Sequence, residues 1–281
     1  AALVGVGYSL TRIYLYVGRL NLSLTTASRT LALLRERPDF ERHGGGFGST
    51  MVMLLTQLAH VQASLGDLAA ARASADAALE AAGRSQRSFD ITLGGYASGV
   101  VHLYDEDLTA AIPDLERGLA ASTTEGAQSM HVAVASLLAY AYLCAGRNLE
   151  ALALARRALS VAETSLYHAN WPRLFGSIVL NANGFPSEAL RLVASARAAA
   201  RKGGYRVQLA WGDLVAAQLR AATNAAAALR YLGQARALSE EIGLRPCLVW
   251  TLIETARLRK QAGRNDDAER LRQRADRKGG V

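Results

Sequence analysis

The feature of this sequence that most constrains its fold is a unit that recurs along its length. In the clearest copy, Ser136 to Leu159, apolar residues recur three and four positions apart on both sides of Gly146. This spacing predicts two amphipathic helices joined by a tight turn. The turn residues of the seven copies stand at positions 18, 66, 106, 146, 184, 223 and 263, at intervals of 38 to 48 residues. Such a period predicts a stack of helix pairs that bury one another's apolar faces.

Small residues recur at two fixed positions in the second helix of the copies. Four copies carry Ala five residues after the turn glycine and Ala again seven residues later: Ala71 and Ala78, Ala151 and Ala158, Ala189 and Ala196, Ala268 and Ala275. The other three are less regular: Ser23 follows Gly18, Ala111 and Gly118 follow Glu106, and Ala228 and Ala235 follow Thr223. Residues seven apart share one helix face. We therefore place them at the crossing with the first helix, where a large side chain would force the two helices apart.

These observations predict an all-α fold, a right-handed α-solenoid of about seven helix pairs that form one superhelical domain over residues 1–281. The predicted units are roughly 1–37, 50–84, 89–123, 128–165, 170–202, 205–242 and 246–278. A glycine-rich connector, 38–49, accounts for the longer first interval. We do not interpret it as a phosphate-binding loop, because it lacks both the terminal Gly-Lys-Ser/Thr and a preceding strand.

Composition agrees with a large helical interior. Apolar residues make up 51% of the chain and charged residues 20%, and only five prolines occur. The net charge of +8 is concentrated between Arg257 and Lys278, where nine basic residues face four acidic ones. Such a run usually forms a solvated helix face, and contact with nucleic acid or an anionic protein is the alternative.

Cysteine usage and hydropathy indicate a cytoplasmic protein. Cys144 and Cys247 lie in apolar helical stretches about a hundred residues apart, as small core residues of a protein in a reducing compartment would. The longest uncharged apolar run, His131 to Ala145, is shorter than the roughly 20 residues that a membrane span needs.

The units match the tetratricopeptide repeat pattern. Three segments resemble more closely the C-terminal repeat region of bacterial multidomain signalling proteins: Asp107–Leu119, which contains Pro113, Leu138–Leu159, and Ala235–Val249. In that family a cyclase or other output domain precedes an ATPase domain, and the repeats follow. The resemblance implies a regulatory piece of a longer protein that senses a signal and passes it to the upstream domains. Similar repeats occur in ATPase-type transcriptional regulators, an alternative that would bring nucleic acid near the basic C-terminal end.

The sequence shows no catalytic or metal-binding motif. Its five histidines lack metal-ligand spacing, and neither His-Glu-x-x-His, Cys-x-x-Cys nor Gly-x-Ser-x-Gly occurs. We therefore expect no intrinsic catalysis, no metal and no cofactor.

The predicted binding surface is the concave face, which the first helix of each pair lines in solenoids of this kind. Residues ten, six and three positions before each turn form one stripe of that face. From this stripe we predict the partner-binding residues Tyr8, Arg12, His60, Tyr96, Tyr140, Asn181, Asp213, Arg220, Arg257 and Lys260. The centre of the stripe is apolar and tyrosine-rich and its C-terminal end is basic, which favours a protein or peptide partner, including the protein's own upstream ATPase or output domain.

Two alternatives concern the aromatic residues. Tyr96 and Tyr140 could instead pack between units. Trp171 and Trp250, near the starts of first helices, are interpreted as packing anchors rather than as ligand contacts.

Overall fold

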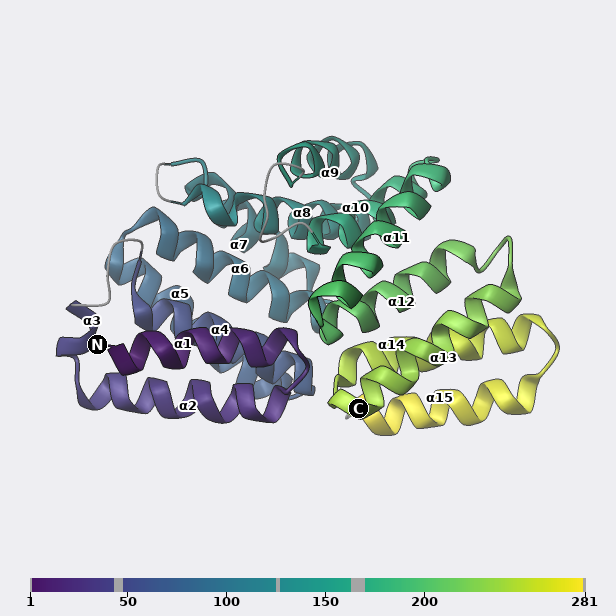
Figure 1. Cartoon of the computed structure of the whole chain (residues 1–281). Helices are drawn as coiled ribbons and strands as arrows, with labels where there is room; N and C mark the ends of the chain where they lie inside the picture. Colours follow the sequence, from purple (N-terminus) through teal and green to yellow (C-terminus); the bar gives the residue numbers. More distant parts are fainter. Residues whose placement is uncertain (1, 43–47, 125–126, 163–169, 280–281) are drawn as a thin grey trace.

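The computed structural model describes residues 2–42, 48–124, 127–162 and 170–279, and this part of the chain is helical without a strand (Figure 1). Its helices are α1 (Ala2–Tyr16), α2 (Leu20–Glu36), α3 (Asp39–Arg42), α4 (Thr50–Leu65), α5 (Leu68–Ser85), α6 (Ser88–Tyr104), α7 (Leu108–Ala121), α8 (Gln128–Cys144), α9 (Asn148–Ala162), α10 (Asn170–Ala182), α11 (Pro186–Gly203), α12 (Arg206–Arg220), α13 (Ala225–Ile242), α14 (Arg245–Gln261) and α15 (Asn265–Gly279).

Apart from the short α3, these helices form seven antiparallel pairs, from α1–α2 to α14–α15, stacked in chain order. The predicted all-α solenoid is therefore confirmed. The helix α3 opens the glycine-rich connector, of which residues 43–47 lie outside the described part. In the described residues no helix is long and apolar enough to cross a membrane.

In six of the seven pairs, the turn between the two helices contains a left-handed backbone residue. Gly66 and Gly146 have φ values of 83° and 75°, and Glu106 adopts 58° although it is not glycine. Side chains that follow the turn then cap the second helix: Asp67 and Asn224 accept hydrogen bonds from the backbone N–H groups of the residues three positions later. The sixth turn, at 221–224, differs because no residue in it has positive φ.

Small side chains at the helix crossings are buried, as the repeat predicts. Ala71, Ala151 and Ala228 have no exposed surface. The closest approach joins α6 to α7, where a Cβ atom on Gly95 would stand 2.4 Å from the carbonyl oxygen of Asp114. The two backbones touch there, so the crossing distance in each pair is set by how little side chain separates the helices.

The stack of helix pairs curves until its N-terminal units contact its C-terminal units (Figure 1). The sequence did not predict this closure. Helix α1 contacts α12, and α4 contacts α14. The ring of Tyr16 meets that of Tyr205 edge-on with centroids 6.0 Å apart, and Tyr104 stacks on Trp211 at 6.0 Å. The inner faces of the first helices therefore surround one shared space.

Replacing Ala151 with leucine should destabilise the protein although both residues are apolar. Ala151 is fully buried in a cluster with Ala139 and Val179, so added methyl groups must push α9 away from its neighbours. We expect Ala151→Leu to lower the free energy of unfolding by about 1–3 kcal/mol in denaturant titrations. Ala153→Leu, on the exposed side of the same helix, is the matched control and should change it little. Equal losses for the two variants would contradict this packing.

Candidate binding site inside the ring

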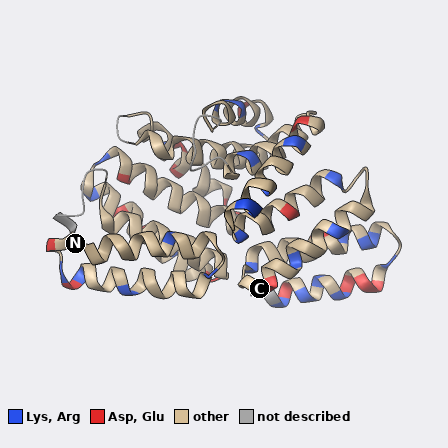
Figure 2. Ribbon diagram, in the orientation of Figure 1, with Lys and Arg blue, Asp and Glu red and all other residues tan. Residues whose placement is uncertain are grey.

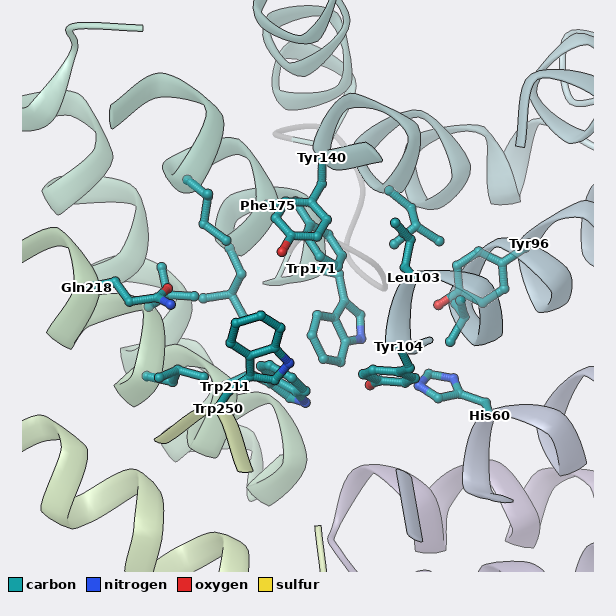
Figure 3. Close-up of a pocket in the computed structure, with 16 residues that line it drawn as sticks. His60, Tyr96, Leu103, Tyr104, Tyr140, Trp171, Phe175, Trp211, Gln218 and Trp250 are labelled. Carbon is teal, nitrogen blue, oxygen red and sulfur yellow. The ribbon is translucent and has the colours of Figure 1, made fainter. Parts of the chain in front are cut away.

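A cavity of about 130 Å³ opens at the centre of the ring, and its lining comes from six of the seven pairs. Every lining residue belongs to a first helix: α4, α6, α8, α10, α12 or α14. Figure 3 shows these side chains converging from opposite sides of the ring. The cavity exists only because the array closes, since residues from α4 and α14 both reach it.

Aromatic rings make up much of the wall. All three tryptophans of the protein line it: Trp171, Trp211 and Trp250. Phe175 stacks on Trp171 with ring centroids 5.8 Å apart and lies 5.4 Å from the ring of Tyr140. Because aromatic rings supply rigid apolar area, they hold the cavity open without long flexible side chains.

The described part of the lining is electrically neutral. Among the described residues it contains no Lys, Arg, Asp or Glu, and burial lowers the pKa of His60 to about 4, so that its imidazole is uncharged at neutral pH. Burial also raises the pKa of Tyr96 and Tyr140, which keeps both phenols protonated. A charged ligand group would therefore lose its hydration here without gaining a charged partner.

Two polar groups in the wall have no protein partner. The indole Nε1 atoms of Trp171 and Trp211 are buried and make no hydrogen bond within the described part of the chain. An unpaired buried donor costs free energy that an acceptor on a ligand would recover. The cavity wall thus combines an apolar surface with two indole donors that have no partner among the described residues.

Three predicted residues meet at this cavity: His60 from α4, Tyr96 from α6 and Tyr140 from α8. The rings of His60 and Tyr96 meet edge-on, 6.3 Å apart. Their positions six or ten residues before the turn therefore do face inward. Lining the cavity is also compatible with packing between units, so the binding role of Tyr96 and Tyr140 stays a prediction.

The other predicted residues lie away from the cavity. Tyr8 and Arg12 pair on α1, with the guanidinium 5.9 Å from the ring centroid. Asn181 is exposed near the end of α10, and Arg257 and Lys260 are exposed on α14.

Asp213 and Arg220, both on α12, also lie outside the cavity lining. The Asp213 carboxylate is buried and pairs with the Arg197 guanidinium of α11 at 2.5 Å, and the Arg220 guanidinium lies 5.2 Å from the centroid of the Tyr231 ring. In this helix the cavity is reached instead by residues 12, 9, 8 and 5 positions before Thr223, namely Trp211, Leu214, Val215 and Gln218. We attribute the change of register to the sixth turn, which lacks the left-handed residue of the others.

The tryptophans and Tyr104 were missed as site residues, although part of the signal was in the sequence. Trp171 and Trp250 both stand 13 residues before their turn residues, one helical step beyond the stripe used for the prediction. Extending the stripe by that step would have found them. Tyr104 and Trp211 reach the cavity through contacts between units 3 and 6, which no local spacing encodes.

The fold is shared with solved structures, but the sequence matches no known protein family model and no curated protein. The Rap conjugation gene regulator of plasmid pLS20 in complex with the Phr* peptide superposes with a TM-score of 0.74 at 15% identity, over 95% of this chain and 71% of that chain. A Rap protein complexed with competence and sporulation factor gives 0.69 at 13%, over 100% and 77%. The apo form of RapI gives 0.65 at 12%, over 95% and 98%. These likenesses establish a tetratricopeptide-type solenoid fold.

Acid should destabilise the protein through His60. Its folded-state pKa, about 4, lies below the ordinary value of 6.5, so the unfolded chain takes up the proton first as pH falls. Stability is complete above about pH 6.5 and is lost progressively down to about pH 4, by on the order of 3 kcal/mol. Denaturant titrations between pH 7.5 and 4.5 should show this loss. His60→Gln, which cannot titrate, should have a flatter profile, and parallel profiles would contradict the assignment.

Proposed function

We propose that this chain is a protein-interaction module that binds a peptide segment of a partner inside its ring, with one apolar side chain seated in the aromatic cavity. The observation that carries the proposal is the neutral, tryptophan-lined cavity assembled from six of the seven helix pairs. In this proposal residues 1–281 act as one superhelical domain with no catalysis of their own.

The size and chemistry of the cavity favour one apolar side chain over other ligands. Its volume of about 130 Å³ is close to that of a cavity of ~150 Å³ that takes up benzene. That space suits a phenylalanine, leucine or similar side chain. A neutral wall disfavours phosphates and free carboxylates.

The solved structures support a peptide rather than another neutral ligand. The pLS20 regulator that superposes on 95% of this chain was solved in complex with a peptide. In this chain a ring of first helices could surround an extended segment and contact it from several units at once.

Binding inside the ring also suits a signalling role. An occupant would touch α4 and α14 together, helices that meet only because the array closes. A ligand that binds the closed array more tightly than an opened one shifts the population toward closure. We propose that this shift is the signal passed to an upstream ATPase or output domain in a cytoplasmic bacterial protein. The coding sequence before Ala1 would test that context directly.

The basic C-terminal end does not favour nucleic acid. Both acidic and basic residues occur along α15 (Figure 2). Arg274 pairs with Glu240 of α13 at 2.5 Å. Such interleaved charge is typical of a solvated helix face. The transcriptional-regulator alternative therefore rests on the sequence resemblance alone.

Tryptophan fluorescence can test the proposal without a label, because every tryptophan lines the cavity. Peptides selected on the immobilised chain by phage display should share a large apolar residue and should change the emission on binding. Trp171→Ala should weaken binding about 30-fold, as loss of an aromatic contact of about 2 kcal/mol does. Trp171→Phe keeps a smaller aromatic ring in the wall, and we expect it to weaken binding less than Trp171→Ala does.

The matched control is Leu149→Ala, at a residue of α9 that is 82% exposed, which should bind as the wild type does. Circular dichroism would confirm that all three variants fold. Peptides that bind Trp171→Ala as tightly as wild type, or that saturate the protein without changing its emission, would refute binding in the cavity.

A further inference from the structure

Helix α1 carries an exposed apolar stripe. Leu3, Val6, Leu10 and Ile13 are 72%, 55%, 36% and 52% exposed. Their spacing of three and four residues places them on one face of the helix. Four large apolar side chains in a row on one helix are more than the scattered exposed residues of an ordinary surface.

The same positions are covered in other units. The four residues stand 15, 12, 8 and 5 positions before Gly18. At the last three of these offsets α4 has Leu54, Leu58 and Val61, and α8 has Val134, Leu138 and Ala141, all of them buried. The stripe of α1 is therefore the interior face of a first helix, left uncovered.

The helix that covers this face elsewhere is the second helix of the preceding unit. Gly94 of α6 stands 12 positions before its turn, and a Cβ atom there would lie 3.3 Å from Ala82 Cβ and Leu79 Cα of α5. Gly176 of α10 stands 8 positions before its turn, and a Cβ atom there would lie 2.9 Å from Leu159 Cδ1 of α9. By the same register, the stripe on α1 is shaped to receive a second helix from the N-terminal side.

The opposite end of the array is finished differently. Among the described residues of α15, no large apolar side chain is exposed, and charged residues cover its surface (Figure 2). A polar outer helix is what a terminal repeat needs for solubility. The C-terminal unit thus caps the solenoid, and the N-terminal unit does not.

We propose that the α1 stripe is the docking face for an amphipathic helix that precedes α1 in the polypeptide and packs as the second helix of a further repeat unit. The connection is short enough: α5 and α6 are separated by two residues, Gln86 and Arg87. A second copy of this chain is a weaker occupant, since one helix stripe from each copy falls short of the roughly 1,200–2,000 Å² that stable interfaces bury.

The experiment supplies such a helix. A copy of Asp67–Ser88, which includes α5 with its N-cap and connector, is joined directly before Ala1, which places it in the register that α5 has relative to α6. We expect the added segment to fold. The helical signal in circular dichroism should then rise by the amount that corresponds to about 18 helical residues, the length of α5. Tm should rise by roughly 2 °C or more. Amide hydrogen exchange in α1 should slow.

Two matched controls separate docking from a general effect of the extension. In the first, Leu79→Glu and Ala82→Glu are made in the added copy only, which keeps its helix propensity but charges the contacting face. In the second, Val6→Glu is made in α1, where the residue is exposed and the 281-residue chain should keep its Tm. Both changes should abolish the rise in Tm and the slowed exchange.

Two results would overturn the proposal. The added helix could remain unfolded while α1 exchanges at its original rate. Alternatively, sedimentation could show that the 281-residue chain is a dimer that Val6→Glu dissociates, which would make a second copy the occupant. Neither result bears on peptide binding in the cavity, whose lining includes no residue of α1.

Discussion

The close crossing of the two helices in each pair is the constraint on which the rest of the structure depends. Ala71, Ala151 and Ala228 are fully buried at these crossings, and Gly95 and Gly118 bring two backbones into contact. Because the side chains at the crossings are small, the two helices of each pair pack close together. Each pair is then rotated by a similar amount relative to the preceding pair. That rotation, repeated over seven pairs, curls the chain until α1 reaches α12 and α4 reaches α14. Curvature, closure and cavity therefore all follow from small residues that touch no ligand.

Local pattern was sufficient to predict the elements, because each unit repeats the same signals. The turn glycines, the alanines five and twelve residues beyond them and the apolar spacing place all seven pairs without tertiary information. The site was predicted only in part. His60, Tyr96 and Tyr140 line the cavity because their turns are regular, whereas the stripe on α12 does not reach it because Thr223 does not adopt the left-handed conformation of Gly146. The stacking of Tyr104 on Trp211 joins residues more than a hundred positions apart, and it depends on the accumulated curvature of the units between them.

The cavity departs from the close packing of the helix crossings. Small apolar side chains fill those crossings, yet at the centre three tryptophans surround open space, and the Nε1 atoms of Trp171 and Trp211 are buried without a partner among the described residues. An unpaired buried donor costs about 1–3 kcal/mol. A chain that needed only a stable ring could fill this volume with aliphatic residues of matching shape. Local violations of packing and hydrogen bonding are expected where a protein binds something, and this one lies where six units meet.

The N-terminal helix α1 links the closure of the ring to the exposed apolar stripe. Helix α1 takes part in closure through the contact of Tyr16 with Tyr205, the residue that immediately precedes α12, and α12 contributes Trp211 to the cavity wall. The outer face of the same α1 carries the uncovered apolar stripe. Helix α1 therefore carries the proposed docking stripe on one side and, on the other, contacts the N-terminal end of α12, which lines the cavity. If a peptide in the cavity favours the closed position of α1, a helix docked on α1 in that position must favour the peptide by an equal free energy, because binding linkage is reciprocal. Through α1, docking at the stripe can therefore affect binding in the cavity, and binding in the cavity can affect docking at the stripe.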